Sequence, residues 1–356
     1  MSFLPMYAPF LPLIYRQTTS HNAHDAENVS PTPLISFSMK FWHLPDFHDR
    51  QAYAVFRISH HMALFLIRYG EIALKSQRVR TRFERALGSN ITSRFVRAGF
   101  ECRLEYERGR IFIWSDHEEF ATAVISRTFG VVSFSRTLET TSAKEDIFAL
   151  AVEVSKRHFK NGMRFCIRAR RSGQHDYTSM ELARDAGSAV FLANEDMKPK
   201  VDLTNPELEI FVDVRQNRAY IYTGNIPGPG GMPLGTQGRV LGLVEKERDI
   251  AACWLIMKRG CRVIVVTETP KLAKPLEAWD PELKVHIPDG GADLSAIARR
   301  RRAEGICLGW DVRDFNARSQ DMADLDIPTF HPLIGMTDEE VDGMVEMVKG
   351  TGRTPS

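Results

Sequence analysis

Apolar side chains recur every four residues in the segment 79–99. The stripe runs through Phe83, Leu87, Ile91 and Phe95. This spacing places the side chains on one face of a helix. A glycine, Gly99, follows the stripe, and glycine commonly ends helices because it adopts a left-handed backbone without strain. The pattern therefore predicts an amphipathic helix with one buried face.

Strands and a second helix surround this helix along the chain. An apolar run at 62–70 predicts a strand before it, and runs over 101–115 predict a hairpin that turns at Arg108 and Gly109. A helix over 118–130 and a further strand follow. The resulting β-α-β-β-α-β order is that of a ferredoxin-like split unit.

A second α+β block comes next. Helices are predicted over 144–159 and 178–195, with a strand over 163–173 between them that runs into a basic loop. Thr178 or Ser179 can cap the second helix. Further strands end before IPGPGGMPLGTQG, a segment in which glycine and proline sustain neither helix nor strand.

Beyond that linker, strands and helices alternate. The strand segments are RVLGLV, CRVIVVTE, LKVHIP, GICLGW and IPTFHP. Alternation of this kind predicts a parallel, doubly wound sheet. We therefore expect an α+β to α/β chain with domains at 62–140, 141–226 and 239–356, joined by a linker at 227–238.

Residues 1–61 follow no sustained period and contain six of the 11 histidines. Carboxylate or cysteine clusters that would complete a metal site do not accompany them. We interpret the segment as a disordered tail or as an extension from an upstream start codon, with Met62 as the alternative start.

Composition narrows the class of protein. The 356 residues include 43% hydrophobic and 26% charged residues, as in soluble globular proteins, and the formal net charge is only +2. Any nucleic-acid surface must therefore be local. Five scattered cysteines without a CxxC favour reduced thiols and a cytoplasmic protein, and leave a metal- or cluster-dependent enzyme as a distant possibility. We find no apolar run long enough to span a membrane.

Several motifs stand in one order from Met62 onward. They are LIRYGEIALKS, KVDLTNPELEIFVDV, PGPGGMPLGTQGRVL, WLIMKRGC and PLIGMTDEEV. In these the chain resembles the tRNA 4-thiouridine synthase family, the thiamine-biosynthesis-type tRNA sulfurtransferases. The resemblance implies a ferredoxin-like domain, a THUMP domain that binds tRNA, and a Rossmann-like PP-loop ATP pyrophosphatase domain, here shortened. It also implies an activity in which ATP adenylates a uridine oxygen and a persulfide sulfur replaces that oxygen.

One departure from the family bears on this activity. The family loop reads Ser-Gly-Gly-x-Asp-Ser, whereas this chain has Glu245, Lys246, Glu247, Arg248, Asp249 and Ile250. Glycines let backbone N–H groups approach phosphate, and side chains fill that space. Two glutamates would also repel a polyanion. We interpret the turn as a solvated charged loop and the domain as retained for packing after its chemistry was lost.

Basic residues predict an RNA surface on the first two domains. Between Gln77 and Arg110 there are nine arginines and four glutamates. Arginine forks suit phosphate, and His175 and Tyr177 either stack on an unpaired base or pack locally. A later cluster, Arg299 to Arg302, is a solvated helix end or an extension of this surface. The predicted RNA-binding residues are Arg68, Lys75, Arg78, Arg80, Arg82, Arg85, Arg168, Arg170, Arg171, His175, Tyr177, Lys198 and Lys200.

Two functions follow from these observations. The first is a tRNA-binding THUMP protein that lacks catalysis of its own, needs no cofactor, and serves as a binding module or as the partner of a separate sulfurtransferase. The alternative is an active tRNA uridine 4-sulfurtransferase that uses ATP and Mg²⁺ through an altered loop. In both, the expected partner is the acceptor region of tRNA, with a homodimer possible and no membrane involved.

Overall fold

The computed structural model describes residues 62–70, 76–107, 109–288, 293–318, 320 and 325–350. All of them belong to one compact unit. The expectations for residues 1–61, Lys75 and Arg108 lie outside the described residues.

The first domain is the expected ferredoxin-like unit. Its elements are β1 (Ala63–Tyr69), α2 (Gln77–Ala98), β2 (Arg103–Glu107), β3 (Arg110–Ser115), α3 (Glu118–Ser126) and β4 (Val131–Thr141). The strands lie in the antiparallel order β2-β3-β1-β4. The helices pack their apolar faces on one side of this sheet.

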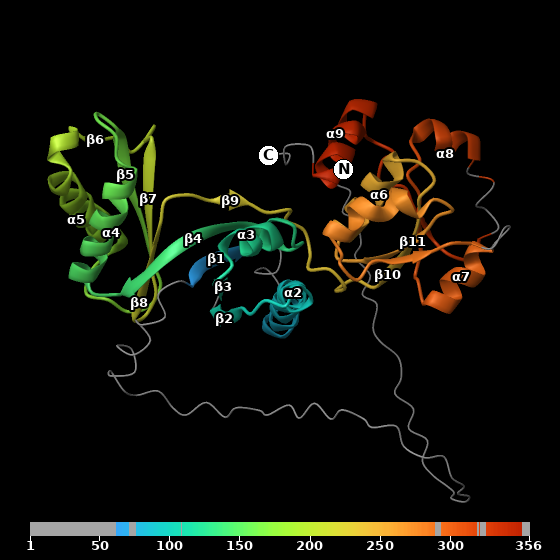
Figure 1. Ribbon diagram of the computed structural model, residues 1–356, viewed down its shortest axis with the longest axis horizontal. Coiled ribbons are helices and arrows are strands. Elements are labelled where there is room, and N and C mark those ends of the chain that lie inside the picture. The colour runs from blue at the N-terminus through green and yellow to red at the C-terminus, as the bar shows by residue number, and fades with distance from the viewer. Residues whose placement is uncertain are drawn as a thin grey trace, which may run out of the picture. The chain divides into compact units, whose positions relative to one another are not determined.

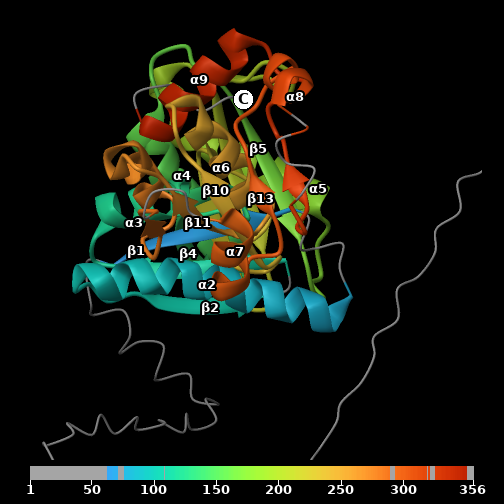
Figure 2. The same cartoon turned by 90° about the vertical axis from the view of Figure 1, so that its right-hand side faces the viewer.

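Helix α2 confirms the sequence pattern, and Figure 2 shows it lengthwise. Phe83, Leu87, Ile91 and Phe95 are all buried. Gly99 ends the helix with a left-handed φ of 73°. The spacing of apolar residues therefore determined both the helix and its buried face.

The second block shares its sheet with the first. Its elements are α4 (Lys144–His158), β5 (Arg164–Arg171), α5 (Ser179–Ala193), η3 (Glu195–Met197), β6 (Lys200–Val201), β7 (Leu208–Val214), β8 (Arg218–Tyr222) and β9 (Ile226–Pro227). Strand β4 pairs with β1 along its first half and with β8 along its second half, so one nine-stranded sheet serves both blocks. Helices α4 and α5 lie side by side on one face of it (Figure 1). Thr178 caps α5 with a capping box, as expected.

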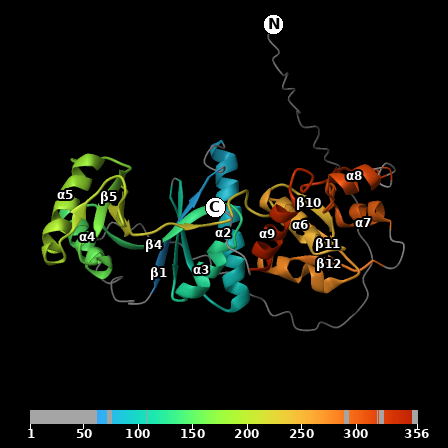
Figure 3. The ribbon, with the colours of Figure 1, turned by 90° about the horizontal axis from the view of Figure 1, so that it is seen from above.

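The third block is a five-stranded parallel sheet with helices on both faces. Its elements are β10 (Arg239–Leu243), α6 (Arg248–Lys258), β11 (Arg262–Val266), η4 (Pro270–Ala278), β12 (Lys284–His286), α7 (Leu294–Arg301), β13 (Ile306–Cys307), α8 (Val312–Arg318), β14 (Thr329–Phe330) and α9 (Asp338–Lys349). The strand order is β12-β11-β10-β13-β14, and all four neighbouring pairs are parallel. Helices α6 and α9 lie together on one face (Figure 3), and α7 packs in the core of the other. The doubly wound prediction is confirmed.

Helix α2 is tied to the linker and to the third block by side chains that donate to backbone carbonyl groups of both segments. Arg94 donates from Nη1 to the Ala278 carbonyl at 2.7 Å and from Nη2 to the Trp279 carbonyl at 2.5 Å. The Asn90 amide donates to the Leu234 carbonyl at 3.1 Å. One side of α2 is therefore occupied by internal contacts.

Candidate functional site

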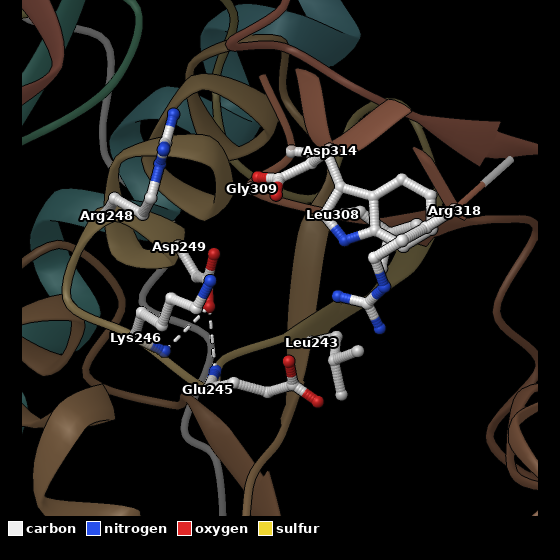
Figure 4. A pocket seen from close by; sticks show the side chains of 10 residues that line it. Leu243, Glu245, Lys246, Arg248, Asp249, Leu308, Gly309, Asp314 and Arg318 are labelled. Carbon is white, nitrogen blue, oxygen red and sulfur yellow. Dashed lines mark hydrogen bonds between the residues drawn. The ribbon is translucent and has the colours of Figure 1, made fainter. Parts of the chain in front are cut away.

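The turn between β10 and α6 holds a carboxylate at its centre. Asp249 Oδ2 accepts the backbone N–H groups of Glu245 and Lys246, each at 2.8 Å (Figure 4). The Asp249 side chain is buried, and this burial raises the pKa of its carboxyl above the usual value. Two backbone donors of the turn are therefore already bound to an anionic group of the protein itself.

A glycine on the neighbouring strand end makes room for this carboxylate. A Cβ at Gly309 would lie 2.0 Å from Asp249 Oδ1 and 2.8 Å from Asp249 Cα. Contacts this short exclude any larger residue unless the turn moves. Asp249 and Gly309 therefore pack as a close pair across the β10–β13 edge.

Two further side chains of the turn are bound to other elements. Glu247 accepts from Lys349 Nζ of α9 at 2.8 Å. Arg248 donates to Asp311 Oδ2, just before α8, at 3.3 Å. Glu245, Lys246 and Glu247 are exposed, as expected of a solvated charged loop, whereas Asp249 is buried and Glu247 and Arg248 are also paired with Lys349 and Asp311.

A small depression lies over this turn. Its cavity volume is about 10 Å³, which is on the order of a single water. Figure 4 shows Glu245 and Arg318 pointing into it. The lining residues are Leu243, Glu245, Lys246, Arg248, Asp249, Leu308, Gly309, Trp310, Asp314 and Arg318.

The lining does not fit a triphosphate. Three acidic and three basic side chains line the depression, so it has no excess positive charge to balance phosphates. Phosphate loops work through converging N–H donors and an open concave backbone. Here two of those donors face inward to Asp249, and Glu245 occupies the rim. The turn therefore differs from a phosphate loop both in where its N–H donors point and in the charge of its lining.

The expected RNA-binding arginines of α2 are in part exposed. Arg78, Arg82 and Arg85 lie on its solvent side, opposite the buried stripe, as predicted. Arg82 also donates to the Thr236 carbonyl at 3.2 Å, and Arg80 is half-buried. These residues keep a basic face on the first half of the helix.

Other arginines of the first domain point inward. Arg68 of β1 donates to Ser135 Oγ at 3.1 Å and lies 4.7 Å over the Tyr222 ring. Burial lowers the pKa of Arg94 to about 10. Arg110 lies 3.7 Å from Asp213. The excess of positive charge on the surface of this domain is therefore smaller than the excess of arginines over glutamates in its sequence.

Three arginines of the second block lie near the end of β5. Arg168 is paired with Glu209 at 2.9 Å, Arg170 is exposed, and Arg171 reaches the carbonyls of Gly173 and His175 at 3.4 and 3.5 Å. Because these contacts of Arg171 are long, Arg170 and Arg171 together form the accessible cationic pair of this loop.

One aromatic expectation is wrong. Tyr177 is 5% exposed, packs in the core of the second block and donates its hydroxyl to the Ser142 carbonyl at 2.7 Å, so its ring cannot stack on a base. His175 is half-buried against the carbonyls of Arg215 and Gln216. Tyr177 therefore packs locally, which was the alternative to base stacking for both rings.

The two lysines before the third strand of this block are exposed. Lys198 has a left-handed φ of 52°, and Lys200 begins β6. Both remain available to an external partner.

A cluster of paired charges was missed from the sequence. Arg218 donates to Glu105 and Glu107 of β2, and lies 3.6 Å from Glu139 of β4. It joins the hairpins of the two blocks. The sequence carried no signal for it because the partners lie far apart along the chain.

The cysteines show no feature of a second functional site among the described residues. Cys253 and Cys307 are buried, and hydrogen bonding with Cys253 together with burial raises the pKa of Cys307. Within the described ranges, no three His, Cys, Asp or Glu side chains gather as a metal site requires. None of the helices described is long and apolar enough to cross a membrane.

Two family models match the chain. The ThiI ferredoxin-like domain matches residues 64–135, and the THUMP domain matches residues 142–223. By fold and domain content, the protein is thus a THUMP-domain protein with a ThiI-type ferredoxin-like domain in front.

Curated relatives share one name. The probable tRNA sulfurtransferase of Methanobrevibacter smithii is 43% identical over 207 residues, which is 56% of this chain and 52% of that protein. The tRNA sulfurtransferase of Pyrobaculum aerophilum is 32% identical over 326 residues, which is 79% of this chain and 65% of that protein. The chain spans about half the length of most of the curated relatives it matches.

Two solved structures are similar over most of the chain. PH1313 from Pyrococcus horikoshii Ot3 has a TM-score of 0.71 at 28% identity and covers 81% of this chain and 99% of its own. A 4-thiouridine synthetase solved as an RNA complex with bound ATP has a TM-score of 0.68 at 19% identity, covering 82% and 86%, and shows the fold alone. The two domain models and the relatives named tRNA sulfurtransferase confirm the expected resemblance to the tRNA 4-thiouridine synthase family, and the two structures confirm the expected fold class.

Proposed function

We propose that this protein binds tRNA through its ferredoxin-like and THUMP domains and does not carry out ATP-dependent sulfur transfer at the β10–α6 turn. It would act in tRNA modification as a binding module or as the partner of an active enzyme. The predicted domain limits of 62–140, 141–226 and 239–356 are part of this proposal.

The RNA-binding half of the proposal is supported by accessible arginines on the two domains. Arg78 and Arg85 lie on the solvent side of α2, and Arg170 and Arg171 lie at the end of β5. Guanidinium groups bind phosphate oxygens with two parallel hydrogen bonds. A similar fold was solved with RNA. We expect recognition of phosphates and shape, with little reading of bases.

One observation carries the negative half. Glu245, Lys246 and Glu247 stand where the family loop has Ser-Gly-Gly, and the N–H groups of Glu245 and Lys246 are already bound to the Asp249 carboxylate. A phosphate at this turn would lose those donors and face the Glu245 and Asp249 charges. Like charges at close range in a partly desolvated site repel by kilocalories. We therefore expect no ATP to be held here.

The alternative, an active sulfurtransferase, has one observation in its favour. The similarity to the Pyrobaculum aerophilum tRNA sulfurtransferase extends over 326 residues and thus into the third block. Asp249 also stands where the family loop has its aspartate. Under this alternative, ATP and Mg²⁺ would bind after the turn rearranges.

Binding and turnover measurements on the full chain separate the two. Calorimetric titration with ATP–Mg²⁺ should give no binding, whereas a tRNA transcript should bind in a filter assay, with affinity that falls steeply as salt rises. Arg170→Gln with Arg171→Gln should weaken tRNA binding. Lys156→Gln with Arg157→Gln, at the exposed end of α4, is the matched control. Formation of 4-thiouridine with ATP and a sulfur donor would establish the alternative, and unchanged tRNA binding by the 170/171 variant would refute the RNA-binding role.

A further inference from the structure

Two residues other than glycine adopt a left-handed backbone among the residues that the structure describes. They are Lys198, with φ of 52°, and Arg302, with φ of 54°. Both are basic and exposed. The other positions with positive φ are glycines, including Gly99 and Gly350 at the ends of α2 and α9.

Arg302 lies where glycine would be the favoured residue. It follows α7 directly and caps it, with its N–H bonded to Ala298 and Arg299 carbonyls. An L side chain in this conformation is destabilised because Cβ approaches the carbonyl oxygen, and glycine avoids that contact. Such strain at an exposed residue points to a role that glycine cannot perform.

The neighbours of Arg302 are also cationic. Arg299 and Arg300 are exposed in the last turn of α7, and Arg301 is half-buried. The nearest anionic partner of Arg299 is Asp293, at 3.8 Å. Cations at a helix C-terminus are favourable, which explains charge in the last turn but not the left-handed arginine beyond it.

This cluster lies at the amino edge of the parallel sheet. The Glu304 N–H donates to the Arg239 carbonyl at 2.8 Å, and Arg239 is the exposed first residue of β10. The depression over the β10–α6 turn is at the opposite, carboxyl edge. The basic amino edge, comprising Arg239, Arg299, Arg300 and Arg302, is therefore distinct from the nucleotide-type position.

The basic amino edge borders the arginine face of α2 through the linker. Arg82 of α2 donates to the Thr236 carbonyl. Gly238, two residues after Thr236, packs against Glu304. A Cβ added at Gly238 would lie 2.8 Å from the Glu304 carboxylate. The path from α2 to Arg239 and the end of α7 thus follows residues 236–238 and passes the exposed Glu304 carboxylate.

We propose that the basic amino edge binds the phosphate backbone of the same RNA that the first two domains hold. This inference rests on the proposed function, because it extends that RNA surface onto the third domain. Arginine forks match phosphate oxygens, and several closely spaced cations suit a repeating polyanion. The third domain then serves as an RNA-binding surface through the edge opposite its altered loop.

The test uses the left-handed backbone to separate charge from fold. Arg302→Gly removes the strain with the charge, so we expect a melting temperature about 1 to 3 °C higher together with weaker tRNA binding. Arg302→Lys keeps a charge and the strain but loses the guanidinium fork, so it should weaken tRNA binding less than Arg302→Gly does. Arg300→Gln with Arg302→Gly should weaken tRNA binding by about tenfold and reduce the salt slope by about 2, since two cations are removed.

Three comparisons decide the result. Arg157→Gln, also in the last turn of a helix, should leave tRNA binding unchanged. If the 300/302 variant binds tRNA like the parent while the 170/171 variant does not, this inference is wrong and the proposed function stands. If neither variant weakens binding, both are wrong. Polyglutamate serves as a second probe, and an equal loss for polyglutamate and tRNA would point to an acidic protein partner and overturn the RNA site.

Discussion

Replacing Asp249 by alanine removes the carboxylate at the centre of the β10–α6 turn. In the folded protein this group accepts the Glu245 and Lys246 N–H groups, each at 2.8 Å, and it is 7% exposed. Hydrogen bonds to charged groups contribute about 1.5–3 kcal/mol each, and the buried charge itself offsets part of this. One water can reach the depression and satisfy a donor. We expect the free energy of unfolding to fall by about 2–4 kcal/mol.

Urea unfolding followed by tryptophan fluorescence measures this change. Trp254 and Trp279 lie in the core of the third domain, so their signal reports its unfolding. Asp249→Asn is the control, because its amide oxygen can still accept both N–H groups, and it should lose about half as much or less. If Asp249→Ala stays within about 0.5 kcal/mol of the parent, these hydrogen bonds do not hold the turn and the reasoning fails.

Three further changes test other parts of the structure. Arg94→Met leaves the Ala278 and Trp279 carbonyls without their donor, and urea unfolding should show a loss of about 2–4 kcal/mol; no loss would mean that α2 is held to the third domain by other contacts. Arg218→Met leaves three carboxylates facing one another, and should lower the melting temperature more at low salt than at high salt; an effect independent of salt would contradict this. Burial raises the pKa of Asp249 above 3.8, so the folded state takes up the proton first and this group adds stability as pH falls from neutral toward 3.8. The parent should therefore gain on Asp249→Asn in unfolding free energy as pH is lowered from neutral toward 3.8, and a difference that stays constant over this whole range would exclude the raised pKa.

The spacing of apolar residues and the residues at turns and helix caps were enough to predict the main elements of the fold. The stripe from Phe83 to Phe95 predicted α2, and the Thr178 cap and the alternating strands of the last block were confirmed. Each of these features depends on residues close together in the sequence. Local patterns of this kind can be read without knowing the tertiary contacts.

The site depended on contacts between distant residues. The family motif placed Asp249 in the turn, but only the structure shows that its carboxylate turns inward and packs against Gly309. Tyr177 was expected to meet RNA and is instead a core residue, because its hydroxyl finds a partner in the Ser142 carbonyl. Arg94 was counted as surface charge, although its guanidinium is buried against carbonyls of the third domain. Composition along the chain cannot distinguish such inward-facing arginines from exposed ones.

The most direct test of the central claim is a calorimetric titration of the full chain with ATP–Mg²⁺, with tRNA binding measured on the same sample. The account predicts no heat of ATP binding at concentrations up to about 1 mM, a range in which even weak ligands are detected, while tRNA binds. Saturable ATP binding that Asp249→Ala abolishes, together with 4-thiouridine in the tRNA, would show that the turn is a working nucleotide site and would contradict it.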